Sequence, residues 1–174
     1  SGDVLLLRGS STISTLIAEM TDSPSQFSHT LIVYVDSANG KTFAVEALLD
    51  KGVIVHDLGE VLNEGVSRMV QYRHGDSVLA ATDGHIASAP ADASIQKNQT
   101  YPYGVLRDMN NYDKVTCAQY IRRAYSIASQ GLVKLPAAPS TLGNKFAHTI
   151  SILKTNFAPM DFYAPSDIDT DSRF

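Results

Sequence analysis

Several residue types that often reveal the class of a protein are scarce in this chain of 174 residues. It has no tryptophan and one cysteine, and 18 Asp and Glu outnumber its 14 Lys and Arg, which gives a net charge of −4. The basic residues are scattered, so the chain lacks the clustered positive charge of a nucleic-acid-binding protein. No apolar run approaches the roughly 18 residues of a membrane span, and no glycine-rich phosphate loop is present. These absences disfavour nucleic-acid binding, nucleotide chemistry and a membrane-spanning role.

The single cysteine, Cys117, excludes an intramolecular disulfide and a zinc site built from several cysteines. We expect no metal and no cofactor. Most lone cysteines are small buried apolar residues. A lone cysteine is also what a thiol enzyme exported to an oxidising compartment would keep, because a second one would trap it in a disulfide. The surroundings of Cys117 therefore decide between a structural and a chemical role.

The remaining composition is that of an ordinary globular protein, with 44% hydrophobic and 18% charged residues. The length suits one domain with its own core, so we predict a single domain over residues 1–174. Apolar runs, helical spacing and turn residues predict an α+β fold. Strands are expected at 3–8, 28–35, 42–49, 53–56 and 66–73, and helices at 11–21, 57–65, 76–88 and 116–129, followed by a loop-rich tail from 136 with short helical pieces.

Cys117 stands in the first turn of the predicted helix 116–129, directly after Thr116, a residue suited to cap it. In the first turn, unpaired backbone N–H groups and the positive end of the helix dipole favour an anionic sulfur and lower the pKa of a thiol. A cysteine with a purely structural role could occupy any buried position in the helix. The position is therefore one that a reactive cysteine needs.

A histidine and a glutamate in the predicted hairpin complete a candidate site. The Asn39-Gly40 turn joins the strands at 28–35 and 42–49. Glu46 interrupts an otherwise apolar strand, where a carboxylate is costly without a partner. Cross-strand partners have a constant index sum, 77 or 79 for closures about this turn, and an odd sum brings Glu46 to the same face as His29. We predict that the two side chains meet; an edge-strand glutamate in solvent is the alternative.

A series of short motifs, taken in order, resembles the circularly permuted papain-like hydrolases. The motifs are Gly2-Asp3 before an apolar strand, Ser28-His29-Thr30, Val45-Glu46-Ala47, Tyr101-Pro102-Tyr103-Gly104 and Cys117 at the start of a helix. The chain is similar to the YiiX/YebB-like branch of the NlpC superfamily, which has lipid-acting relatives of lecithin–retinol acyltransferase. Papain-type enzymes place the cysteine before the histidine. The reverse order here fits a permuted version.

The resemblance implies the fold and the role of each residue. The fold would be a circularly permuted papain-like (NlpC-type) α+β fold, with an antiparallel sheet or small barrel packed against helices that carry the nucleophile. Cys117 would be the nucleophile, His29 the general base and Glu46 the residue that orients His29. Tyr103 and Ser28 would line the site and help to bind the substrate or the oxyanion.

The expected activity is thiol hydrolysis through an acyl-enzyme, with a peptide or cell-wall muropeptide as substrate. One alternative is a lipid acyl hydrolase or acyltransferase that uses the same three residues. Others are a silent lipid- or peptide-binding module and a scaffold protein with a structural cysteine. We expect no nucleic-acid partner, and association with a membrane surface or the cell wall is compatible with the family; the oligomeric state stays open. We also expect a bacterial envelope or secreted location, with any targeting segment upstream of Ser1.

Overall fold

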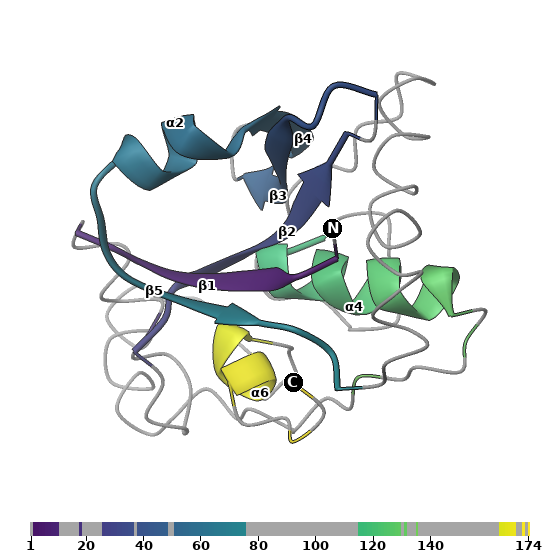
Figure 1. The fold of residues 1–174 in the computed structure, drawn as a ribbon. Coiled ribbons are helices and arrows are strands. Elements are labelled where there is room, and N and C mark those ends of the chain that lie inside the picture. Colours follow the sequence, from purple (N-terminus) through teal and green to yellow (C-terminus); the bar gives the residue numbers. More distant parts are fainter. Residues whose placement is uncertain are drawn as a thin grey trace, which may run out of the picture.

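The centre of the molecule is a five-stranded sheet in which every pair of neighbours is antiparallel. The computed structural model describes residues 2–10, 26–36, 38–48, 51–75, 115–129 and 164–169, with single positions at 18, 131, 135, 172 and 174. The strand order is β4-β3-β2-β1-β5 (Figure 1). The strands are β1 (Val4–Gly9), β2 (His29–Val35), β3 (Thr42–Leu48), β4 (Gly52–Asp57) and β5 (Val66–Tyr72).

Helices cover both faces of this sheet (Figure 1). Helix α4 (Cys117–Ala128) packs on one face together with α6 (Pro165–Asp169), and the short α2 (Leu58–Asn63) packs on the other. The larger core, under α4, includes Leu6, Ile32, Val45, Tyr120 and Ile121, and the smaller core, under α2, includes Leu7, Leu31, Ala44 and Val61. None of the helices in the described ranges is long and apolar enough to cross a membrane.

Strand β1 lies between β2 and β5 and is buried on both faces, which explains its unbroken apolar sequence. Val4 and Leu6 face α4, whereas Leu5 and Leu7 face α2, as the two-residue period of a strand requires. Burying each leucine contributes on the order of 2 kcal/mol. Strand β1 therefore holds β2, and with it His29, in a fixed position in the sheet.

The hairpin predicted around Asn39-Gly40 is confirmed. Gly40 has φ of +71°, in the left-handed region that glycine tolerates, and the Asp36 carboxylate accepts from the N–H of Ala38 at 2.9 Å. Val35 pairs with Thr42, an index sum of 77, which is one of the two predicted registers. The odd sum means that the side chains of β2 and β3 alternate in the predicted phase.

The other predictions within the described residues also hold. The segments 53–56, 66–73, 57–65 and 116–129 correspond to β4, β5, α2 and α4 to within two residues, and α6 is one of the short helical pieces expected in the tail. The helix predicted at 11–21 is described only at Ala18, which is helical. The helix predicted at 76–88 lies outside the described residues.

Strands β2 and β3 pair along only part of their length. The ladder runs from Val35 opposite Thr42 to Ile32 opposite Val45 and ends there. Beyond that point β2 stays paired with β1 as far as His29, while β3 stays paired with β4. The two strands therefore separate at the end of the sheet that carries His29. In this part of β2, the backbone groups that face β3 are not paired with it.

Candidate active site

Cys117 is the first residue of α4, in the first turn as predicted. The hydroxyl of Thr116 accepts from the N–H of Gln119 at 3.2 Å, and the Gln119 side chain accepts from the N–H of Thr116 at 3.0 Å. This reciprocal capping box fixes the start of the helix and with it the position of the sulfur. Cys117 is buried, with 5% of its surface exposed.

The sulfur of Cys117 accepts hydrogen bonds from the backbone N–H groups of Thr30 and Ala118. Ala118 lies in the first turn of α4, where N–H groups have no partner within the helix. The N–H of Thr30 is available because β2 and β3 separate. Val33 donates to Asp3 on the β1 side, so the even-numbered residues of β2 direct their N–H groups to the opposite side. At Thr30 that side holds the sulfur in place of a β3 carbonyl.

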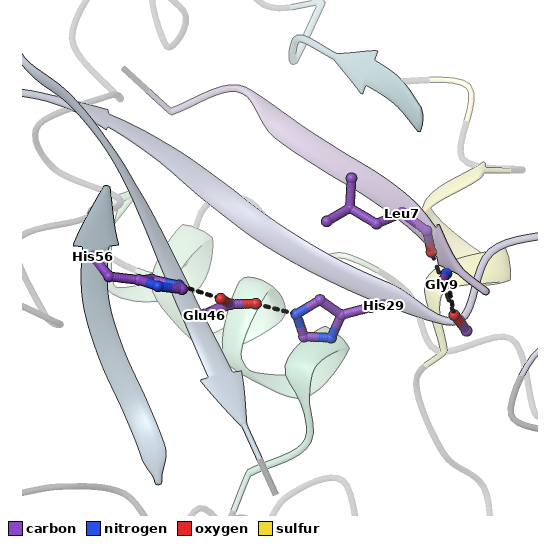
Figure 2. A network of polar contacts seen from close by, with 6 residues as sticks. Leu7, Gly9, His29, Glu46 and His56 are labelled. Carbon is purple, nitrogen blue, oxygen red and sulfur yellow. Dashed lines mark hydrogen bonds and ion pairs between the residues drawn. The ribbon is translucent and has the colours of Figure 1, made fainter. Parts of the chain in front are cut away.

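His29, the first residue of β2, hydrogen-bonds to both Cys117 and Glu46. Its Nε2 bonds the Oε2 of Glu46 (Figure 2), which leaves Nδ1 as the ring nitrogen for the sulfur. Burial alone would lower the pKa of His29. The charge and hydrogen bond of Cys117, followed by those of Glu46, outweigh burial and raise that pKa to about 10. His29 is therefore an imidazolium at neutral pH.

The pKa of the Cys117 thiol shifts in the opposite direction to that of His29. Burial alone would raise the pKa of Cys117, but the charge and hydrogen bond of His29, with the N–H groups of Thr30 and Ala118, lower it from its ordinary value. A raised pKa on the imidazole and a lowered pKa on the sulfur describe a thiolate–imidazolium pair. The thiolate is the nucleophilic form of cysteine.

Glu46 is 3% exposed and lies on β3, which is an interior strand. The alternative of an edge-strand glutamate in solvent is therefore wrong. Burial alone would raise the pKa of Glu46, but the hydrogen bonds and charges of His29 and then of His56 lower it. The carboxylate is thus ionised beside the imidazolium, and it fixes the orientation of the His29 ring.

His56, on β4, is a member of this cluster that was not among the predicted site residues. Its Nε2 bonds the Oε1 of Glu46, so the carboxylate lies between two imidazoles (Figure 2). His56 pairs with Ala44, two residues before Glu46, and so shares its face of the sheet. The signal was present in the sequence, because the index-sum rule that brings His29 to Glu46 applies equally to the β3–β4 hairpin.

Two other predicted site residues remain. Ser28 is 4% exposed, and its hydroxyl lies 3.5 Å from the carbonyl oxygen of Leu7 and 3.4 Å from the backbone nitrogen of Gly9. Through these contacts Ser28 fastens the start of β2 to β1. Tyr103 lies outside the described residues.

The cluster joins four elements from different parts of the chain. Helix α4 supplies the sulfur, β2 and β4 each supply an imidazole, and β3 supplies the carboxylate. In the part of the chain that the structure describes, no group of three or more His, Cys, Asp or Glu side chains is arranged to hold a metal ion. The arrangement suits nucleophilic attack by sulfur coupled to proton transfer through His29.

Comparison with known proteins shows that the chain is similar in fold to a solved structure. A crystal structure described as the metalloprotein YiiX from Escherichia coli O157:H7 (DUF1105) superposes with a TM-score of 0.75 over 99% of this chain and 93% of that one, at 17% sequence identity. No protein-family model matches the chain, and no curated protein does. The chain therefore has a YiiX-like α+β fold.

Proposed function

We propose that the protein is a cysteine hydrolase that cleaves an amide bond, with Cys117 as nucleophile, His29 as acid and base, and Glu46 as the orienting carboxylate. The observation that carries the proposal is the hydrogen bond between Cys117 and His29, with its opposite pKa shifts on the two groups. A cysteine that only fills space gains nothing from a charged partner, and burying charges costs free energy unless each is well paired. Reactivity accounts for the arrangement, whereas packing does not.

The reaction follows from the protonation states. The Cys117 thiolate attacks the carbonyl carbon and forms a carbon–sulfur bond. His29 gives its Nδ1 proton to the leaving nitrogen as the carbon–nitrogen bond breaks, which leaves a thioester on Cys117 and a neutral imidazole. His29 then takes a proton from the water that attacks the thioester. The carbon–sulfur bond breaks, the acid leaves and the thiolate returns, while Glu46 keeps the His29 ring in place throughout.

The start of α4 also supplies a donor for the negative charge that develops on the carbonyl oxygen. The backbone N–H of Cys117, at the first helical position, has no acceptor within the helix. Donors of this kind stabilise a tetrahedral intermediate by about 3 kcal/mol each in well-studied hydrolases. The same N-terminus that favours the thiolate would therefore favour the oxyanion.

The proposed family and substrate class rest on the resemblance carried by the sequence motifs. Histidine and glutamate on the sheet precede the cysteine on the helix, which is the order of a circularly permuted, NlpC-type papain-like hydrolase. The YiiX-like fold supports that relation. Members of the NlpC superfamily act on peptides, and we propose a small peptide such as a cell-wall muropeptide as the substrate.

The first experiment is alkylation of Cys117 by iodoacetamide as a function of pH, followed by mass spectrometry of the intact protein. We expect fast modification well below the pH at which an ordinary thiol reacts, and a profile in His29→Ala that moves up toward that of an ordinary thiol. His74→Gln is the matched control, because His74 packs on Tyr125 and Phe174. A parent profile that already equals that of a free thiol would overturn the proposal.

The second experiment defines the substrate, using muropeptides and acyl esters with and without EDTA or zinc. We expect muropeptide cleavage that survives EDTA and is lost in Cys117→Ser. Cleavage of acyl esters alone would reassign the substrate to lipids. Activity that EDTA abolishes and zinc restores would contradict thiol chemistry, and YiiX is described as a metalloprotein.

A further inference from the structure

The Glu46 carboxylate is held from both sides. Its Oε2 bonds Nε2 of His29 and its Oε1 bonds Nε2 of His56 (Figure 2). Glu46 is 3% exposed, whereas the side chains of His29 and His56 are 24% and 23% exposed. The carboxylate therefore depends on these two rings, rather than on bulk water, for its hydrogen bonds.

An ionised carboxylate only accepts hydrogen bonds, and each of its oxygens needs a donor when it is buried. His29 satisfies one oxygen of Glu46 and His56 satisfies the other. The terminal torsion of a glutamate is broad and roughly two-fold. Without the donor from His56, the carboxylate could rotate about this torsion so that Oε1 reaches another partner. The orientation of Oε2 toward His29 would then be less well defined.

The sheet holds His56 in position for this contact. His56 pairs with Ala44 inside the β3–β4 ladder. The next residue, Asp57, is the N-cap of α2 and accepts from the N–H of Gly59 at 2.7 Å. Besides His56, the titratable groups of the cluster are Glu46 from β3, His29 from β2 and Cys117 from α4. The His56 ring is thus attached to the ordered end of a strand, where its reach to Glu46 is fixed.

We propose that His56 is a positioning residue that acts through Glu46: its Nε2–H holds Oε1, so that Oε2 stays directed at the catalytic imidazole. This inference rests on the proposed function, in which His29 is that imidazole. It requires a proton on Nε2 of His56, because a carboxylate cannot donate.

Two variants of His56 separate positioning from mere packing. His56→Gln keeps an N–H donor at a similar reach, and His56→Leu keeps the bulk without the donor. We expect the alkylation profile of Cys117 in His56→Leu to move up by about one pH unit, a tenfold loss of thiolate at a fixed pH below the midpoint. His56→Gln should restore most of the shift. A folded His56→Leu whose profile matches that of the parent would refute the proposal.

A measurement on the unmodified protein covers the case in which His56→Leu does not fold. The 15N chemical shifts of the histidine rings report which nitrogen carries the proton. We expect His56 with its proton on Nε2, assigned by loss of its signals in His56→Gln. A neutral His56 protonated on Nδ1 alone has no proton to donate to Glu46, and that result would rule out the contact.

The two proposals fail in different ways. An acid-shifted parent profile that depends on His29 but is the same in His56→Leu leaves the hydrolase standing and removes the role of His56. An ordinary thiol profile in the parent removes the hydrolase and, with it, the positioning role. The 15N measurement then still shows whether His56 holds Glu46, as a structural contact only.

Discussion

Two carboxylates are buried in the sheet, Asp3 directly before β1 and Glu46 on β3, and they differ in their partners. Asp3 is 5% exposed and Glu46 is 3% exposed. Burial alone would raise the pKa of each, yet hydrogen bonds and charges lower both. Asp3 receives two parallel bonds of 2.7 Å from the guanidinium of Arg73, whereas Glu46 receives its bonds from His29 and His56.

The difference in partner decides what each region is able to do. A guanidinium keeps its charge at every pH at which the protein is folded, whereas an imidazole gains and loses a proton near neutrality. Asp3 and Arg73 therefore form a permanent brace between the start of β1 and the end of β5. In the proposed mechanism, Glu46 supports a group that has to release and recover a proton. The same cost of burial then accompanies a structural contact in one region and a catalytic one in the other.

The largest expected effect comes from Glu46→Gln, which keeps the shape and removes the charge. We expect kcat for the hydrolysed amide to fall by about 10² to 10⁴, because the His29 imidazolium loses its counter-charge and its orientation. Steady-state kinetics with the substrate identified above gives the number. Circular dichroism should show a folded protein.

Asp3→Asn is the control for that experiment, since it makes the same chemical change at the other buried carboxylate. We expect the melting temperature to fall by a few degrees while kcat stays close to that of the parent. Equal losses of activity in the two variants would mean that both carboxylates act only by holding the sheet together.

The pH dependence gives the next largest effect. The pKa of His29 is raised from 6.5 to about 10, so the imidazolium persists below that pH and is lost above it. We expect kcat/KM to fall about tenfold per pH unit above this limit, because the leaving nitrogen is no longer protonated. In Glu46→Gln the basic limb should move to lower pH. A limb that stays in place would show that Cys117 alone sets the pKa of His29.

The same shift has a consequence for stability with a definite sign. A pKa raised by folding contributes stability that is complete below the unfolded value, near 6.5, and is lost as the pH rises through about 10. The Asp3–Arg73 contact keeps both charges across that range. We therefore expect the free energy of unfolding, measured by chemical denaturation, to be lower at pH 10 than at pH 7 in the parent. The decrease should be smaller in His29→Gln.

The smallest expected effect is that of Arg73→Lys. The lysine keeps the charge but loses the two-pronged geometry, and the Arg73 side chain is 68% exposed, so solvent already screens much of the contact. We expect a drop in melting temperature of about 1 to 2 °C and the parent alkylation profile at Cys117. An altered profile would connect the two regions and end the contrast between them.

The sequence was sufficient for the parts of the site that follow local rules. The Asn39-Gly40 turn limited the hairpin to two registers, and both registers place Glu46 and His29 on the same face. Thr116 predicted the start of the helix, and so the exposed N–H groups around Cys117. Each of these inferences needed only a turn type, a strand period or a cap.

The missing parts depend on how neighbouring elements meet. The separation of β2 from β3 on the His29 side of Ile32 lies where α4 contacts both strands, and no turn or strand rule for the hairpin predicts it. His56 looked like an ordinary strand-end histidine, and the register rule that led to His29 was not applied to the β3–β4 hairpin, where it places His56 on the face of Glu46. Ser28 was linked to the site by its place beside His29 in a motif, and the contacts of its hydroxyl with the backbone of β1 depend on how β1 and β2 meet.

The bond from the N–H of Thr30 to the sulfur of Cys117, which helps to lower the pKa of the thiol, forms only when β2 and α4 meet. Thr30 and Cys117 are far apart in the chain, and nothing in the isolated helix supplies the imidazolium. A newly made chain therefore carries an ordinary, mostly protonated thiol until β2 and α4 have docked. In the proposed mechanism the nucleophile is thus a product of folding, which would spare the unfinished chain from alkylation and oxidation during its synthesis.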